Sequence, residues 1–240
     1  MTMPLPKAFG FDVFGTVVDW RGGVIREVTD FLHGIDRSDI DAAEFADAWR
    51  MQYLSVMTAY AASGRDFVTL DVLHREMLDD TLQKFGLNLA KLDADQVEHL
   101  NACWHRLDPW PDAVAGIAQL RAKFPVVTLT NGNVRMMLNM ARRSGLEWDA
   151  LLGAEVTRIY KPAPQAYLRT AELLGVAPHE LCLVASHHAD LAAARACGLA
   201  TAYIHRPMEF GGAAAPDASA AQTWDWHCDG IDQLAAEMCG

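Results

Sequence analysis

Four short apolar runs stand out along the chain, and each one ends in small or polar residues. They cover residues 8–14, 124–133, 181–186 and 201–207 and read AFGFDVF, FPVVTLTNGN, LCLVAS and TAYIHRP. Each run is too short for a typical helix and is rich in the branched and aromatic residues that favour strands. The pattern therefore predicts four strands.

Stretches typical of helices lie between these predicted strands, at 112–123, 134–145, 163–175 and 187–197. Strands that alternate with helices indicate parallel βαβ units, in which helices cover both faces of the sheet. The predicted fold class is therefore α/β, with a Rossmann-like parallel sheet as its core.

A long region between the first and second predicted strands follows a different pattern. Amphipathic helical segments at 42–60 and 67–86 dominate it, and no convincing strand is present. We expect this region to form an α-helical subdomain, inserted after the first strand, that could cover the site as a cap. Pro109 and Pro111 interrupt any helix in the return linker at 104–113. The predicted domains are a core of residues 1–19 and 105–240 and a cap of residues 20–104, with a loop at 211–222.

Composition narrows the class of protein. Apolar residues make up 51% of the 240 residues and charged residues 21%, as in ordinary globular proteins. The net charge of -11 and the lack of a long basic run disfavour binding to nucleic acid. No window reaches the roughly 18 apolar residues of a membrane span, and the N-terminus does not resemble a signal peptide. The five cysteines are scattered without a CxxC pair, which predicts reduced thiols in a cytoplasmic protein.

Polar residues follow the ends of the predicted strands. Because the carboxyl ends of parallel strands meet at one edge of a sheet, where ligands bind, we expect these residues to lie close together. They are Asp12, Thr130, Asn131, Ser186 and His187, together with Lys161 in the loop IYKPAPQAY and Asp190 at the end of LVASHHAD.

An aspartate, a hydroxyl, a lysine and a second aspartate occur in that order at Asp12, Thr130, Lys161 and Asp190. This order resembles the four motifs of the haloacid dehalogenase (HAD) superfamily over nearly the whole chain. The superfamily's phosphatases carry DxD in the first motif and GDxxxD in the last. Here Phe14 stands at the second aspartate and Ser186 at the first acid of the last motif. The segments FDVFGTVVD, TNGN and YKPAPQAY and the non-acidic last motif instead resemble the type II L-2-haloacid dehalogenases.

The resemblance implies a hydrolase that needs no metal or other cofactor and removes halide from short 2-haloacids. Its substrates would be L-2-haloacids or haloacetates, with fluoroacetate as a candidate. Asp12 would attack the halogen-bearing carbon to form an ester, and water would then attack the ester's carbonyl. Only the first step occurs at the substrate carbon, so the configuration of that carbon is inverted overall. A halide leaves without a proton, although fluoride benefits from hydrogen bonding, so an acid at position 14 is dispensable. Phe14 can instead wall a dry pocket in which the carboxylate is more nucleophilic.

Further roles follow from the same resemblance. Lys161 would orient Asp12 and keep it ionised, because a nearby cation favours a carboxylate. Arg50, after Trp49 in the cap, would cradle the leaving halide, with Asn131 as a second contact. The remaining candidates are Thr16 beside the nucleophile, Asp190 on the hydrolytic water or on Lys161, His187 as a base or as a space-filling residue, and Phe14, Thr130, Tyr167, Ser186, Met51 and Leu54 around the substrate.

Structural alternatives stay open for several of these residues. Thr16 could cap the turn, Asp190 could serve a helix N-terminus, and Met51 and Leu54 could belong to the core of the cap. Ala185 and His187 depart from the serine and asparagine of familiar members, which affects the expected substrate range. The alternative functions are another covalent aspartate hydrolase, acting on a strained cyclic amino acid, a Mg²⁺-dependent phosphatase, and a non-catalytic binding protein. Familiar members often dimerise, so a homodimer is also an expectation.

Overall fold

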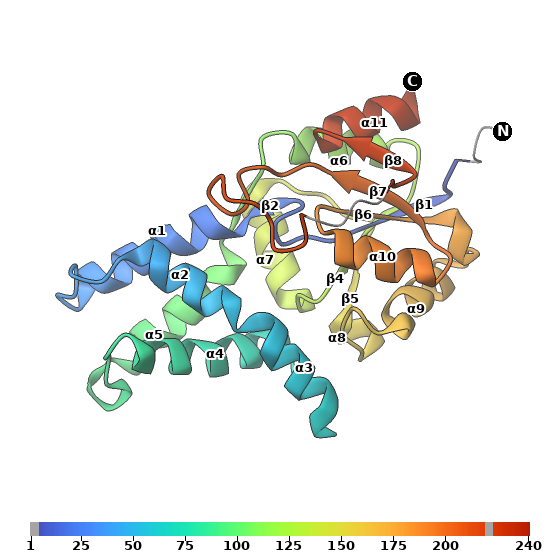
Figure 1. Cartoon of the computed structure of the whole chain (residues 1–240). Coiled ribbons are helices and arrows are strands. Elements are labelled where there is room, and N and C mark those ends of the chain that lie inside the picture. The colour runs from blue at the N-terminus through green and yellow to red at the C-terminus, as the bar shows by residue number, and fades with distance from the viewer. Residues whose placement is uncertain (1–4, 219–222) are drawn as a thin grey trace. The chain divides into compact units, whose positions relative to one another are not determined.

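The computed structural model describes residues 5–218 and 223–240, and the chain divides into two compact units (Figure 1). The first unit comprises Met1–Asp19 and Asp108–Gly240, and the second comprises Trp20–Leu107. The return to the first unit comes three residues later than the sequence predicts. The reason is that a short 3₁₀ helix, η2 (Ala102–His105), still packs against helices of the second unit.

A parallel sheet forms the centre of the first unit, as predicted. Within the described residues it has six strands in the order β5-β4-β1-β6-β7-β8, and every neighbouring pair is parallel. The strands are β1 (Ala8–Phe11), β4 (Val126–Thr130), β5 (Ala150–Gly153), β6 (Leu181–Ala185), β7 (Ala200–Ile204) and β8 (Trp226–Cys228). The four predicted strands are all present, whereas β5 and β8 were not predicted. All four residues of β1 are buried, because strands lie on both sides of it and helices on both faces.

Helices cover both faces of this sheet. The helices α6 and α11 pack against each other on one face, and α9 and α10 lie together on the other (Figure 1). The four predicted helices of the core are confirmed within one or two residues at each end. The helices of this unit are α6 (Ala113–Arg121), α7 (Val134–Ser144), α8 (Ala154–Thr157), α9 (Pro164–Leu174), η3 (Pro178–Glu180), α10 (His188–Ala196) and α11 (Ile231–Cys239).

A two-stranded antiparallel ribbon marks the place where the chain leaves the first unit and returns to it. Val18 of β2 (Val18–Asp19) pairs with Pro109 of β3 (Asp108–Pro109). The ribbon fixes the end of the loop that follows β1. The predicted loop at 211–222 consists of turns and irregular chain up to residue 218, and its last four residues lie outside the described residues.

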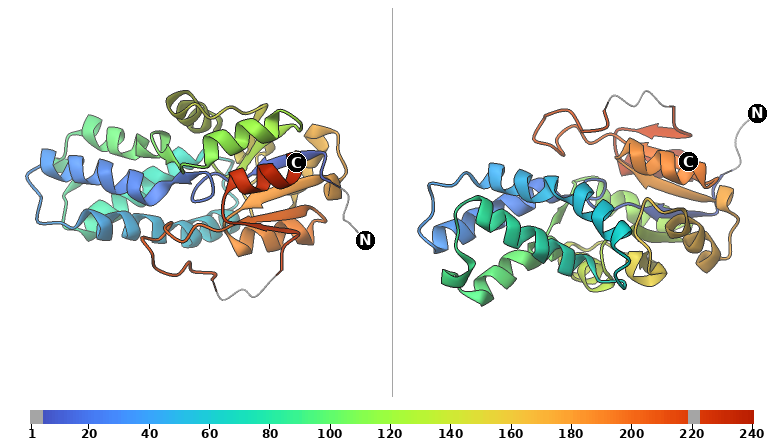
Figure 2. Two further views of the ribbon diagram at one scale, coloured as in Figure 1. Left: turned by 90° about the horizontal axis from the view of Figure 1, so that it is seen from above. Right: turned by 60° about the horizontal axis from the view of Figure 1, so that its bottom comes forward.

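The second unit, all of which is described, contains only helices and loops, as the pattern predicts. Both α2 and α5 pack against α1 and against α4, so four helices form a closed bundle (Figure 2). The predicted helix at 42–60 is in fact two helices, separated at Gln52, whose side-chain amide donates to the Met77 carbonyl of α4 (3.1 Å). The elements are α1 (Trp20–Gly34), α2 (Ala42–Met51), α3 (Tyr53–Ser63), α4 (Leu70–Lys84), η1 (Leu89–Lys91) and α5 (Ala94–Asn101).

Two further predictions from composition can be compared with the structure. All five cysteines are free thiols, as predicted. None of the helices in the described ranges combines the length and the apolarity that a bilayer crossing requires.

Candidate active site

Asp12 is the first residue after the central strand β1. Its backbone N–H donates to the Val184 carbonyl of β6 (3.0 Å), which extends the strand pairing by one residue. The chain then turns back on itself, because Val17 N–H donates to the Val13 carbonyl (2.9 Å) and Gly15 N–H donates to the Val18 carbonyl (3.0 Å). Asp12 is thereby held at the carboxyl edge of the sheet with only 7% of its surface exposed.

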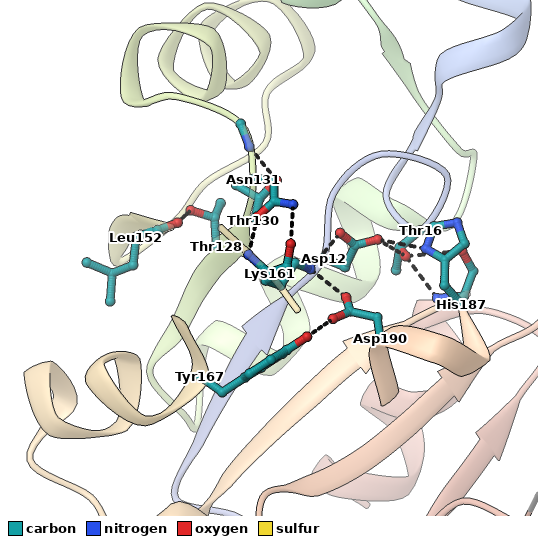
Figure 3. Close-up of polar contacts among 12 residues, drawn as sticks. Asp12, Thr16, Thr128, Thr130, Asn131, Leu152, Lys161, Tyr167, His187 and Asp190 are labelled. Atoms are coloured by element: carbon teal, nitrogen blue, oxygen red, sulfur yellow. Dashed lines mark hydrogen bonds and ion pairs between the residues drawn. The ribbon is translucent and has the colours of Figure 1, made fainter. Parts of the chain in front are cut away.

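The Asp12 carboxylate receives hydrogen bonds on both oxygens (Figure 3). Lys161 Nζ donates to Oδ1 (2.9 Å), Thr16 Oγ1 donates to Oδ2 (2.9 Å), and His187 Nδ1 lies 3.2 Å from the same Oδ2. Burial raises the pKa of Asp12, but the charge of Lys161 and the contact with His187 outweigh burial, so the pKa lies well below its usual value. Asp12 is therefore ionised at neutral pH.

Lys161 links Asp12 to a second carboxylate. Its Nζ donates to Asp190 Oδ2 (2.5 Å), and the Tyr167 hydroxyl donates to Asp190 Oδ1 (2.6 Å). Burial lowers the pKa of Lys161, but the two carboxylates raise it further, so the pKa lies above its ordinary value. The structure thus brings together Asp12, Lys161, Tyr167 and Asp190, which lie up to 178 positions apart in the sequence.

Asn131 holds the backbone of Lys161. Its side-chain Oδ1 accepts from Lys161 N–H (2.8 Å), and its Nδ2 donates to the Lys161 carbonyl (3.2 Å). The neighbouring Thr130 hydroxyl accepts from Gly132 N–H (3.1 Å). Both residues therefore shape the strand-end loops, and their contacts with halide and substrate remain predictions.

Ser186 and Thr16 join the loops that follow β6 and β1. Ser186 N–H donates to Thr16 Oγ1 (2.9 Å), and the two hydroxyl oxygens are 3.1 Å apart. Ser186 Oγ also donates to Glu209 Oε2 (3.3 Å). These bonds place the Thr16 hydroxyl beside Asp12 as part of a network.

Glu209 is a member of the cluster that sequence reasoning missed. It follows β7, is 2% exposed, and places Oε1 2.9 Å from His187 Nε2. The rule that collects polar residues at the carboxyl ends of strands would have found it, if applied to the segment after β7 as well. Arg206, three residues earlier, anchors this segment, because its guanidinium donates to the Thr16 carbonyl (2.9 Å) and pairs with Asp112 (2.8 Å).

Phe14, a predicted site residue, and His188, which follows His187, also lie in the first unit. Phe14 is half-buried, and a Cβ added to Gly132 would lie 3.2 Å from its Cε2, so the ring packs against the turn after β4. His188 points away from the cluster, since its ring stacks on Tyr203 (4.6 Å between centroids) and accepts from Trp224 Nε1 (2.9 Å).

Arg50, Met51 and Leu54 belong to the second unit. The Arg50 guanidinium lies 4.4 Å from the centroid of the Tyr53 ring and 5.6 Å from that of Trp20. Met51 and Leu54 are 71% and 72% exposed, so the alternative that they form part of the cap's own core is wrong.

The site combines a parallel α/β sheet with an ionised aspartate that follows the central strand. A lysine donates to that aspartate and to a second aspartate. This arrangement defines a class of aspartate-dependent hydrolases. The chain belongs to the haloacid dehalogenase-like hydrolase family, whose model matches residues 6–198. The resemblance noted in the sequence is thereby confirmed.

Individual relatives carry more specific names. The chain is 32% identical over 210 residues to (S)-2-haloacid dehalogenase 1 of Pseudomonas sp. (strain CBS-3), covering 85% of this chain and 88% of that one. It is 43% identical to the crystal structure of the defluorinating L-2-haloacid dehalogenase Rha0230, with a TM-score of 0.95 over 100% of this chain and 97% of that one. L-2-haloacid dehalogenase of Xanthobacter autotrophicus, with chloropropionic acid covalently bound, is 25% identical, with a TM-score of 0.80 over 98% and 99% of the two chains.

Proposed function

We propose that this protein is a hydrolytic dehalogenase of short 2-haloacids and acts through an ester on Asp12. The observation that carries the proposal is a buried, ionised carboxylate paired with Lys161, with the apolar Phe14 two residues further on instead of an acid. The names of the relatives support the same reaction, and the chloropropionic acid bound covalently to one of them supports an ester intermediate.

The reaction divides into two displacements. An oxygen of Asp12 attacks carbon 2 of the substrate, and the carbon–halogen bond breaks with its electron pair on the halide. Water then adds to Cγ of the ester, and the bond between Cγ and the ester oxygen breaks to release the alkoxide. The alkoxide takes one proton of the water, and the other proton is released to solvent when Asp12 ionises again. The products are a 2-hydroxy acid, a halide and a proton.

The surroundings of Asp12 suit the first displacement. Burial removes water that would solvate the carboxylate, and Lys161 keeps it ionised although it is buried. No proton is needed for chloride or bromide to leave, which accounts for an aromatic ring at Phe14. Asp190 accepts from Lys161 on the side away from Asp12, and the Tyr167 hydroxyl donates to Asp190, so the position of Lys161 is fixed.

The second unit is proposed to act as a cap, with Arg50 on the departing halide and Met51 and Leu54 on the substrate's apolar part. Two highly exposed apolar side chains beside an arginine support this role. Replacing Arg50 by Gln is expected to lower kcat/KM for chloride release at least roughly 100-fold, because a desolvated charge pair is lost. Arg65→Gln, an exposed arginine of the same unit, is the matched control. Equal activity of the two variants would remove Arg50 from the site.

The experiment that tests the function is halide release from chloroacetate, fluoroacetate and both enantiomers of 2-chloropropionate, with EDTA present. We expect release from the L enantiomer with D-lactate as product, and none from the Asp12→Asn variant. A single turnover in H₂¹⁸O should place the heavy oxygen in the peptide that contains Asp12, because water attacks Cγ. Heavy oxygen only in lactate would contradict the ester.

Defluorination is a second, finer proposal, supported by the similarity to a relative named as defluorinating. Fluoride release from fluoroacetate tests it. Halide-free hydrolysis of a strained cyclic amino acid, or Mg²⁺-stimulated hydrolysis of a phosphate ester, would instead favour the alternatives. A cytoplasmic location, a homodimer and the lack of nucleic-acid binding stay predictions, and sizing chromatography with light scattering tests the dimer.

A further inference from the structure

His187 lies between two carboxylates, one at each ring nitrogen. Its Nδ1 is 3.2 Å from Asp12 Oδ2, and its Nε2 is 2.9 Å from Glu209 Oε1. A neutral imidazole has one N–H, so one of its nitrogens would turn a lone pair towards an anionic oxygen. An imidazolium donates from both nitrogens and satisfies both carboxylates. The geometry is therefore that of a protonated histidine.

We propose that Glu209 is a positioning residue that keeps His187 protonated, so that His187 donates to Asp12 Oδ2 while the ester is hydrolysed. The proposal rests on the dehalogenase mechanism given above. In this proposal His187 is a hydrogen-bond donor that keeps its proton. This role replaces the expectation that His187 acts as a base on water.

The two oxygens of Asp12 have unequal surroundings. Oδ2 accepts from Thr16 and faces His187, whereas Oδ1 accepts from Lys161. Because Oδ2 is the more heavily hydrogen-bonded oxygen, Oδ1 is the better nucleophile and becomes the ester oxygen. Oδ2 then becomes the carbonyl oxygen. When water adds to Cγ, the carbonyl electron pair moves onto Oδ2, where the Thr16 hydroxyl and the His187 N–H receive it. The pair returns to Cγ as the bond to Oδ1 breaks, and His187 keeps its proton throughout.

Glu209 is needed because Asp12 loses its charge in the intermediate. Burial lowers the pKa of His187, but Glu209 and Asp12 raise it to about 10. Once Asp12 is an ester, Glu209 is the carboxylate that still faces the ring. The other charged groups near this cluster bind elsewhere. Lys161 binds Asp12 and Asp190. Arg206 is paired with Asp112. Glu209 therefore sustains the imidazolium during hydrolysis.

The turn after β1 is shaped around the Glu209 carboxylate. A Cβ added to Gly15 would lie 2.1 Å from Glu209 Oε1, which is closer than any real contact. Ser186 Oγ donates to the other oxygen, Oε2 (3.3 Å). The carboxylate thus packs against the loop that carries the nucleophile and has little freedom to leave His187.

The test compares the intact protein with Glu209→Gln, which keeps the side chain's size and removes its charge. In ¹⁵N-histidine spectra, His187 of the unmodified protein should stay doubly protonated through pH 9, with the signal assigned by its loss in His187→Asn. In Glu209→Gln, His187 should lose its second proton at a lower pH than in the unmodified protein, and the signal should change accordingly. Glu147→Gln, an exposed glutamate paired with Arg121, is the matched control and should leave the signal unchanged.

Kinetics give the second readout. In a single turnover with L-2-chloropropionate, Glu209→Gln should release halide at the normal rate and hydrolyse the ester roughly 10- to 100-fold more slowly, since one stabilising donor is weakened. The peptide containing Asp12 should then carry the mass of the ester. Glu209→Asp, which retains the charge, should recover part of the rate and guards against a folding defect in Glu209→Gln.

Several outcomes would overturn the proposal. A neutral His187 at pH 7 in the unmodified protein would do so, as would Glu209→Gln with normal ester hydrolysis. Ester hydrolysis that accelerates as His187 loses its proton would identify a base and not a donor. If no haloacid releases halide, the proposed function fails, but the spectra still decide whether Glu209 holds the proton on His187.

Discussion

Lys161 stands between the buried carboxylate of Asp12 and the partly buried carboxylate of Asp190 and binds both. Replacing it by Met should lower the free energy of unfolding by about 3–5 kcal/mol, because the carboxylates would lose their buried partner. Halide release should fall to background, since Asp12 would lose the charge that keeps it ionised. Urea unfolding at pH 7 and a halide assay measure the two effects.

Lys7→Met is the control for that substitution. Lys7 pairs with Glu180 at 2.6 Å but is exposed, so its loss should cost less than about 1 kcal/mol and leave activity unchanged. Equal losses for the two variants would mean that burial does not strengthen the Lys161 pairs.

Sequence patterns predict some of these contacts and leave others undetermined. Asp12 and Asp190 follow strands of one parallel sheet, and Lys161 and Tyr167 belong to one motif, so their meeting could be predicted. The bonds from Asn131 to the Lys161 backbone depend on the path of two loops, for which the sequence has no periodic signal. Glu209 was missed for a different reason, because the rule for polar residues at strand ends was not applied to the segment after β7.

The turn from β1 into the ribbon depends on Gly15, which has a φ of +83° and touches Glu209. Gly145 ends α7 with a φ of +74° but has open space around its Cα. Alanine at Gly145 should therefore cost only the left-handed strain, about 1–2 kcal/mol. Alanine at Gly15 should cost clearly more, because its Cβ would displace the Glu209 carboxylate.

Urea unfolding of the two single variants measures the difference. A further variant that combines Gly15→Ala with Glu209→Ala should regain part of the loss, since the displaced group is removed. Equal costs at Gly15 and Gly145 would show that the loop yields to the added methyl group.

The four inner strands of the sheet were predicted, and the two edge strands were not. In β5 and β8 only the last residue is buried, so they lack the fully buried apolar run of β1, β4 and β6. The break at Gln52 lies inside a continuous amphipathic stretch. The Gln52 amide bonds to Met77 and Thr81 of α4, so tertiary contacts, which no local pattern contains, accompany the break.

Each unit contains a histidine with a strongly shifted pKa, buried His74 in the second unit and partly buried His187 in the first. The two pKa values are shifted in opposite directions. His74, in the second unit, has a pKa lowered from 6.5 to about 3, mainly because of burial. The charge of Asp71 raises this pKa, and the charges of Arg50 and His105 lower it. The two carboxylates around His187, in the first unit, raise its pKa from 6.5 to about 10. The native state thus resists protonation at His74 and deprotonation at His187.

The sign of each effect on stability follows from proton linkage. The stability associated with neutral His74 is complete above pH 6.5 and is lost as the pH falls towards 3, because the unfolded chain then binds the proton more readily. The stability associated with charged His187 is complete below pH 6.5 and is lost as the pH rises towards 10, because the native state then holds the extra proton. The free energy of unfolding should therefore be highest near neutral pH.

Urea unfolding between pH 4.5 and 9.5 would separate the two contributions, each on the order of a few kcal/mol across its range. His74→Phe, which keeps a ring to stack on Trp104, should flatten the acid limb and leave the alkaline limb intact. His187→Asn should flatten the alkaline limb from about pH 6.5 upwards and leave the acid limb intact. Because the two residues lie in separate units, the double variant should combine both effects additively. An alkaline limb that persists in His187→Asn would mean that other groups, and not the pair of carboxylates around this ring, govern the loss of stability above neutral pH.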